Sequence, residues 1–356
     1  MKSRLAAVAI LCLPLAWGAG AAPLRIKLGT LAPQGSTWHQ LLQEMAQKFA
    51  QESGGQVELK IYAGGTQGNE GEMIRKMAIG QLQAASITAI GIHEITPEPQ
   101  VEDVPFLIDS YEEYDYVHEK IRPKLDAAIE KKGYVVLQWS EVGFVYFFST
   151  KPYQTPADFA QGKVFTWNGD PDAEAAWKKA GFHPVVLSST DLIPAISSGM
   201  VNIVAQPPLY AFTTHIFEKA ENMLNMHWGF LTGATVVKRD AWQKIPEPIR
   251  KKLLEIGEDY GERTRKDVRK QNDEAIVQMK KRGLNVLEPA DVEEWHKIAD
   301  QANTVIRGKV VPAAIFDQVI HQRAECSSVT PGSPSTSMRS PEAAVRCPRK
   351  VPNGCT

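Results

Sequence analysis

The chain has 356 residues, of which 43% are hydrophobic and 23% are charged, and its formal net charge is -1. This length allows two domains with separate cores, and the composition is that of an ordinary soluble protein. Because acidic and basic residues are interspersed and almost balanced, the sequence lacks the basic stripe that neutralises phosphates, and we expect no nucleic-acid partner.

The first residues have the pattern of an export signal. Lys2 and Arg4 precede an apolar run from Leu5 to Trp17, which is too short to anchor the chain in a bilayer. The small residues that follow, Ala19-Gly20-Ala21, fit a peptidase site. We predict a signal peptide over residues 1–21, cleavage after Ala21 and a periplasmic mature chain.

The cysteines lie outside the body of the chain. Cys12 falls within the apolar run, and Cys326, Cys347 and Cys355 fall near the C-terminus, so residues 22–325 contain no thiol. Neither a disulfide framework nor a cysteine-based zinc site holds this body together. An exported body of this size without cysteine is typical of bacterial envelope proteins stabilised by burial.

Strand and helix patterns alternate along the first half of the chain and again along the second. The expected strands are 24–28, 57–62, 163–167, 184–187 and 201–205, and the expected helices follow them. Residues 134–149, rich in Val, Tyr, Phe and Trp, are expected to link the two runs as one or two crossing strands. This alternation predicts an α/β fold.

The C-terminal third has a different pattern. Residues 249–282 contain neither proline nor a turn cluster and carry apolar residues at helical spacing, which predicts one very long helix, broken if anywhere near Gly257 or Gly261. After residue 324 the composition changes to Ser, Pro, Arg and Cys without periodicity. We interpret residues 324–356 as a disordered or non-native tail.

Known catalytic and metal-binding motifs are missing. The glycines of "GGTQG" at 64–68 lack the spacing of a nucleotide loop and indicate a tight turn. His93-Glu94 has no second histidine one turn later. We therefore expect no enzymatic activity, no cofactor and no His- or Cys-based metal site, although the sequence leaves an oxygen-only site open.

Aromatic residues form the most informative pattern. Phe144, Tyr146 and Phe148 alternate along one expected strand, and Phe165 and Trp167 alternate along another. A core role explains either set alone. However, Phe165 and Trp167 end a strand directly before a turn and a helix, which is where ligands bind in open α/β sheets.

Four segments together resemble the solute-binding proteins of tripartite ATP-independent periplasmic (TRAP) transporters, the family typified by the C4-dicarboxylate binder. They are "YAGGTQGNEGEMIRKMAIGQLQ" at 62–83, "VPFL" at 104–107, "TPADFAQGKVF" at 155–165 and "LIPAISSGMVNIV" at 192–204. The resemblance covers roughly residues 22–320. It implies a two-lobed binding protein of the Venus-flytrap type, with crossing strands and a long bracing helix.

The resemblance also implies a domain layout and partners. We expect an N-terminal lobe over 22–142, a C-terminal lobe over 143–235, and helices packing on both lobes over 236–323. A monomer would capture a small organic solute and deliver it to the membrane permease subunits of the transporter. The alternatives at this stage are a receptor that presents a solute to a membrane sensor and, less favoured, an exported hydrolase.

The sequence departs from the family pattern at one decisive position. The family has an arginine that grips the ligand carboxylate where this chain has Phe165, and Gln206 stands where metal-dependent relatives have an acidic residue. We therefore expect an apolar, aromatic or weakly acidic solute rather than a dicarboxylate. The expected ligand-binding residues are Phe165, Trp167, Asn168, Trp38, Glu141, Phe144, Tyr146, Gln206, Tyr210 and Trp228.

Overall fold

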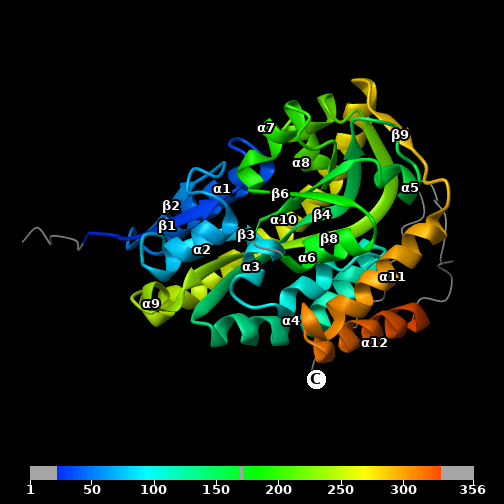
Figure 1. Cartoon of the computed structure of the whole chain (residues 1–356). Helices are drawn as coiled ribbons and strands as arrows, with labels where there is room; N and C mark the ends of the chain where they lie inside the picture. Colours follow the sequence, from blue (N-terminus) through cyan, green and yellow to red (C-terminus); the bar gives the residue numbers. More distant parts are fainter. Residues whose placement is uncertain (1–21, 169–170, 330–356) are drawn as a thin grey trace, which may run out of the picture.

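A computed structural model describes residues 22–168 and 171–329, and within them the chain forms one mixed α/β molecule (Figure 1). Its strands form a single sheet of nine. They are β1 (Leu24–Thr30), β2 (Val57–Tyr62), β3 (Ala84–Thr88), β4 (Tyr134–Ser149), β5 (Lys163–Trp167), β6 (His183–Leu187), β7 (Ile203–Gln206), β8 (Asn222–Lys238) and β9 (Asn285–Leu287).

The helices cover both faces of this sheet. They are α1 (Thr37–Glu52), α2 (Glu70–Ala78), α3 (Ala89–His93), α4 (Tyr111–Lys131), α5 (Pro156–Phe159), α6 (Pro171–Lys179), α7 (Leu192–Ser197), α8 (Pro208–Thr213), α9 (Arg239–Trp242), α10 (Glu247–Lys281), α11 (Val292–Lys309) and α12 (Ala313–Val329). Three short 3₁₀ turns, η1 (Glu98–Asp103), η2 (Ser189–Asp191) and η3 (Ile216–Glu218), join them within the described residues.

Two long strands connect two lobes. The strand order is β2-β1-β3-β8-β4-β7-β5-β6, with β9 added on β8. β4 and β8 are 16 and 17 residues long and pair antiparallel, with register shifts along the way. β3 pairs with the end of β8, whereas β7 pairs with the end of β4, so each long strand serves both lobes. The expected two-lobed fold with crossing strands is confirmed.

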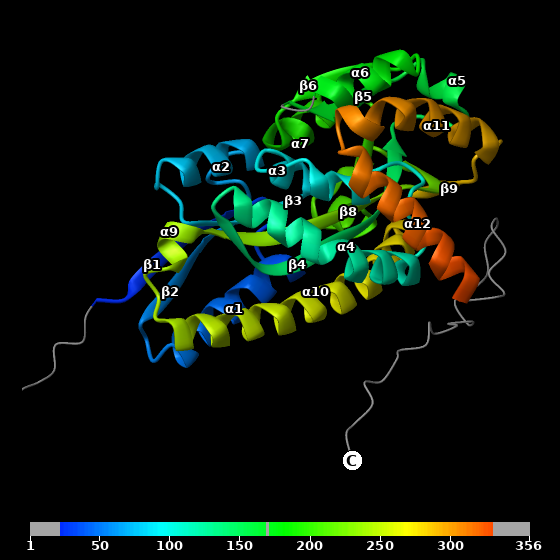
Figure 2. The ribbon, with the colours of Figure 1, turned by 90° about the horizontal axis from the view of Figure 1, so that it is seen from below.

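The helix α10 braces the two lobes. It contacts α1 on one lobe and α8 on the other, and it packs along β4 between them (Figure 2). The helix is unbroken over 35 residues, which agrees with the prediction of one very long helix, and the break that the sequence left open at its glycines does not occur. A Cβ atom on Gly257 would lie 2.1 Å from the carbonyl oxygen of Leu137, and one on Gly261 would lie 2.6 Å from that of Trp139. The glycines therefore allow α10 to approach the backbone of β4.

The last helix extends past the expected start of the tail. α12 continues to Val329 and packs on α4, so the boundary at residue 324 is six residues too early. The physical reason is that Cys326, seven residues after the buried Val319, is itself buried and continues the apolar face. The expected signal peptide and residues 330–356 lie outside the described residues.

We predict that Gly261→Ala and Gly257→Ala each lower the free energy of unfolding by about 1–3 kcal/mol, because the added methyl group must push α10 off the β4 carbonyls. This loss outweighs the roughly 1 kcal/mol that alanine gains over glycine in a helix. Asp259→Ala, on the exposed side of the same helix, is the control. Urea unfolding measures the difference, and glycine variants as stable as wild type would show that the close approach is unimportant.

Candidate functional site

Three adjoining cavities lie where the two lobes meet. Their volumes are about 180, 100 and 20 Å³. We call the first the apolar chamber, the second the polar chamber and the third the rim cavity. Ile90 of α3 and Trp167 at the end of β5 line all three. Because these residues come from opposite lobes, the cavities form one cleft, and its two larger chambers adjoin at Ile90, Trp167 and Leu231.

Glu70 is the buried carboxylate of the polar chamber. Its oxygens accept hydrogen bonds from the backbone N–H of Thr88 at 2.8 Å, the Thr88 hydroxyl at 2.7 Å and the backbone N–H of Gly91 at 2.9 Å. Burial raises the pKa of Glu70, while these hydrogen bonds act in the opposite direction. Glu70 therefore fixes the junction of β3 and α3, and at the cleft it presents a carboxyl group that holds its proton more readily than an exposed one.

Gln206 and Tyr210 reach the polar chamber from the other lobe. Gln206 ends β7, and the Pro207-Pro208 pair that follows starts α8, which carries Tyr210. Burial, with a smaller contribution from Glu70, raises the pKa of Tyr210 to about 12. Its hydroxyl group therefore stays protonated at neutral pH and is able to donate a hydrogen bond to a solute.

Glu141 lines the polar chamber, but its charge is already paired. The guanidinium of Arg269 on α10 donates to both carboxylate oxygens of Glu141, at 2.7 and 2.9 Å, and to both of Asp115, at 2.8 and 2.6 Å. It also lies over the ring of Tyr111, 4.5 Å from the centroid. Burial lowers the pKa of Arg269, but the hydrogen bonds to the two carboxylates outweigh it and the net shift is upward.

An asparagine of α10 holds the irregular part of β4 in place. Asn272 donates to the carbonyl oxygen of Val142 at 2.9 Å and accepts from the backbone N–H of Leu209 in α8 at 2.8 Å. On the other side, the indole N–H of Trp38 donates to the carbonyl oxygen of Glu141 at 3.2 Å. The backbone at the register shift between Glu141 and Gly143 therefore accepts hydrogen bonds from side chains of α1 and α10.

The apolar chamber has a wall of aromatic rings. Trp177 of α6 and Trp228 of β8 both line it, and they stack with ring centroids 5.5 Å apart and an interplanar angle of 21°. Phe106 and Phe147 pack against Trp228 at 5.5 and 5.1 Å. Three residues of α11 also line this chamber, namely Ile298, Ala302 and Ile306.

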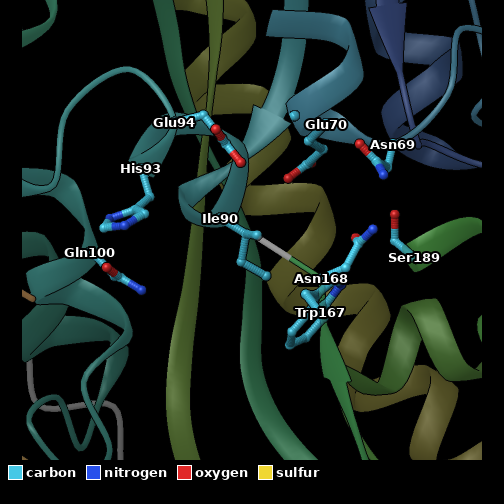
Figure 3. A pocket seen from close by; sticks show the side chains of 10 residues that line it. Asn69, Glu70, Ile90, His93, Glu94, Gln100, Trp167, Asn168 and Ser189 are labelled. Atoms are coloured by element: carbon cyan, nitrogen blue, oxygen red, sulfur yellow. The ribbon is translucent and has the colours of Figure 1, made fainter. Parts of the chain in front are cut away.

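The rim cavity lies where the lobes touch (Figure 3). Asn69 and Glu70 at the start of α2 lie opposite Ser189, Asn168 and Trp167 of the second lobe. The amide of Asn69 donates to the hydroxyl of Ser188 at 3.2 Å, and its side-chain oxygen caps α2. This hydrogen bond joins the two lobes across the cleft.

The structure brings seven of the ten expected ligand-binding residues to the cleft. Trp167 lines all three cavities, Asn168 lines the rim cavity and Trp228 lines the apolar chamber. The other four, which line the polar chamber, are Trp38, Glu141, Gln206 and Tyr210. Phe165, Phe144 and Tyr146 line none of them. Phe165 is buried in the core with its ring 5.2 Å from that of Trp167 at 81°, and Tyr146 hydrogen-bonds His227 at 2.8 Å.

Sequence reasoning missed several residues that line the cleft or hold its lining in place. Glu70, Ile90, Trp177, Arg269 and Asn272 were not expected at the site. The capping box at the start of α2, formed by Asn69 and Glu72, marks the position of Glu70 in the sequence. No local pattern marks Arg269 and Asn272, because their role depends on α10 crossing β4 more than a hundred residues away.

None of the residues that line the three cavities in the described ranges is a lysine or an arginine. The acidic side chains there are Glu70, Glu94, Asp103 and Glu141, and His93 lines the rim cavity. Among the described residues there is also no group of three or more His, Cys, Asp or Glu side chains that could hold a metal ion. The cleft therefore offers a solute hydrogen bonds and apolar surface, without a lining cation.

The family profile described as "Bacterial extracellular solute-binding protein, family 7" matches residues 28–305. The chain belongs to this family. Its members are solute-binding receptors of TRAP transporters and not enzymes, so the hydrolase hypothesis is set aside. Family membership implies a periplasmic location, and none of the helices within the described ranges has the length and hydropathy of a membrane span.

Individual relatives are distant in sequence but alike in fold. The C4-dicarboxylate-binding periplasmic protein of Rhodobacter capsulatus is 24% identical over 268 residues, which cover 72% of this chain and 77% of that protein. The TRAP solute-binding protein of Ralstonia eutropha, solved with bound (S)-2-acetolactate, has a TM-score of 0.79 and 19% identity, covering 85% of this chain and 99% of that one. The one from Xanthobacter autotrophicus, solved with bound β-D-galacturonate, has a TM-score of 0.78 and 16% identity, covering 84% and 99%.

We predict that Arg269→Met lowers the free energy of unfolding at pH 7 by about 3–5 kcal/mol, because it leaves the fully buried carboxylate of Glu141 without its partner. Burial already raises the pKa of Glu141 and Arg269 opposes that shift, so the variant raises this pKa further. A carboxyl group with a raised folded-state pKa contributes stability below its unfolded pKa, about 4.3, and loses it as the pH rises through the folded value. The difference in the free energy of unfolding between wild type and Arg269→Met should therefore become smaller as the pH falls toward 4.

Arg263→Met is the matched control for this measurement. Arg263 lies on the same helix, over the ring of Tyr260 at 4.7 Å, and pairs with Glu44, but both members of that ion pair are half exposed. Its loss should change stability by less than about 1 kcal/mol. Equal effects of the two variants at pH 7, or a deficit for Arg269→Met that does not vary with pH, would contradict the role assigned to the buried pair.

Proposed function

We propose that this protein captures a small organic solute in the cleft between its lobes and delivers it, as a monomer, to the permease subunits of a TRAP importer in the membrane. The observation that carries the proposal is the divided cleft at the lobe junction, lined from both sides and closed over by the hydrogen bond between Asn69 and Ser188. Family membership supports solute capture rather than presentation to a sensor.

We infer further that the solute is neutral or carries a single weakly acidic group on an apolar or aromatic body. The named ligands of the relatives, a C4-dicarboxylate, acetolactate and galacturonate, are organic acids. A carboxylate in this cleft would meet no lining lysine or arginine, and so would lack charge-assisted hydrogen bonds of about 1.5–3 kcal/mol. Apolar surface buried against Trp167 at about 25 cal/mol per Å² compensates for this loss.

Hydrogen-bond donors and acceptors of the polar chamber orient the solute. Tyr210 is a protonated donor, Gln206 offers both a donor and an acceptor, and the carboxyl group of Glu70 offers acceptors. Such partners suit an amide, a hydroxyl or a single acid group. If a solute carried two carboxylates, at least one of them would be desolvated without a partner of opposite charge, which disfavours dicarboxylates.

We predict that aromatic monocarboxylates or their amides stabilise the protein more than succinate or glucuronate does, and that Trp167→Leu weakens their binding about 10- to 100-fold. Trp167 supplies the largest apolar surface common to the three cavities, and this loss corresponds to roughly 1.4–2.8 kcal/mol. Thermal unfolding screens the compounds, and at a hundredfold excess over Kd a true ligand adds about 2.7 kcal/mol. Titration calorimetry then gives Kd for wild type and variant.

Trp242→Leu is the control for Trp167→Leu. Trp242 lies in α9, is buried in the core of the first lobe and lines none of the three cavities, so its replacement should lower stability without changing Kd. Succinate or glucuronate binding tightly to both variants, with no response to aromatic or neutral compounds, would exclude the proposed solute class.

Lobe closure gives a separate prediction. Because the lobes are joined by β4, β8 and α10, which can bend where the strand register shifts, a bound solute should bring the lobes together by a hinge motion. Small-angle X-ray scattering should show a smaller radius of gyration in the presence of a ligand found in the screen. The same radius with and without that ligand would argue against closure on binding.

A further inference from the structure

The apolar chamber extends the cleft beyond the polar chamber. It has the larger volume, about 180 against about 100 Å³. Its lining includes Trp177, Trp228, Ile298, Ile306 and Val310. Space of this kind is unusual in a protein interior, which is packed as densely as an organic crystal.

Rigid surroundings keep this space open. Trp228 is held between Trp177, Phe106 and Phe147, so the indole that forms the wall has ring contacts on several sides. Two small side chains, Ala176 on α6 and Ala302 on α11, also line the chamber. Larger side chains at these positions would fill it. The two helices contact each other, and the segment that contains Gln100, Asp103, Val104 and Pro105 completes the lining.

The chamber is continuous with the proposed solute site. Ile90, Trp167 and Leu231 line both chambers, so the polar chamber around Glu70 and Tyr210 adjoins the apolar chamber at these side chains. A single elongated molecule that passes Trp167 would meet polar groups at one end and apolar groups at the other. An apolar space of this type gains more from an apolar occupant than from water, since ordered water needs polar partners.

We propose that the apolar chamber is a subsite for the tail of the solute, and that the natural ligand is an elongated amphiphile. Its compact hydrogen-bonding head lies in the polar chamber, and an alkyl or arylalkyl tail passes Trp167 and ends between α6 and α11. This inference rests on the proposed function and adds to it the length and polarity of the solute. It also assigns α11, which follows the two lobes in the sequence, a direct part in solute selection.

The experiment uses a homologous series with one head and a growing tail. The compounds are benzoate, phenylacetate, 3-phenylpropionate and 4-phenylbutyrate, together with their primary amides, measured by titration calorimetry on the full chain. Each added methylene group that enters the chamber should tighten binding about three- to fourfold. The gain should stop once the chamber is full.

Two variants test whether the tail occupies this chamber. Ala302→Leu and Ala176→Leu each place a larger side chain in the chamber from a different helix, and both should abolish the gain with tail length while leaving the affinity for the shortest compound within about twofold. Gln301→Leu, on the exposed face of α11, is the matched control and should keep the gain. Because binding of the short compound reports a folded cleft, a variant that merely misfolds is recognised.

Each outcome decides between the two proposals. A gain with tail length in wild type that disappears in both chamber variants supports the tail subsite. Equal affinity along the series, or a gain that persists in both chamber variants, overturns the subsite and leaves the proposed function standing. Binding of a dicarboxylate or sugar acid with no binding by any member of the series overturns the proposed solute class, and the subsite with it.

Discussion

The approach of α10 to the crossing strand β4 is the constraint on which the rest of the molecule depends. Two glycines let the helix reach the strand carbonyls, and farther along the helix Arg269 and Asn272 bind the segment where the strand register shifts. A strand with a register shift has backbone groups that lack hydrogen-bond partners within the sheet. Asn272 supplies such a partner to the carbonyl oxygen of Val142. The same segment lines the polar chamber. Stability and cleft geometry are therefore set by one contact surface.

The charges near the cleft are consistent with this arrangement. Arg269 pairs with Glu141 of the polar chamber, and Glu141 and Asp115 together take up its hydrogen bonds. It therefore neutralises the protein's own carboxylate instead of a carboxylate on the solute. Burial raises the pKa values of Glu70 and Tyr210, and Tyr210 stays a protonated donor at neutral pH. In such surroundings an ionised group on a solute would lose hydration without gaining a partner of opposite charge.

Local patterns predicted the elements well, and the site only in part. Alternating strands and helices, the long helix and the crossing strand β4 follow from periodicity and turn residues, which act over short stretches of chain, whereas β8 was not predicted from its sequence. Phe165 and Trp167 have the same parity on β5, yet only Trp167 reaches the cleft, because it ends the strand and its ring covers that of Phe165. Phe144 and Tyr146 do not line the cleft, for a related reason. Val145, between them, points to the apolar chamber, and strand alternation sends its neighbours to the other face. Arg269 and Asn272 depend on tertiary contacts that no short segment encodes.

The energetics of closure explain why an apolar solute suits this cleft. Across the rim, the lobes are joined by the neutral hydrogen bond between Asn69 and Ser188, and a bond of that kind contributes only about 0.5–1.5 kcal/mol. Moving a receptor from mostly open to mostly closed requires about 5.5 kcal/mol of differential binding. Apolar burial of about 200 Å² supplies roughly 5 kcal/mol of this. Such burial exists only when Ile90 of one lobe and Trp167 of the other cover the solute together. In the proposed mode of binding, the solute therefore provides most of the free energy that holds the lobes closed, and a long apolar tail would provide it without the desolvation cost of a charge.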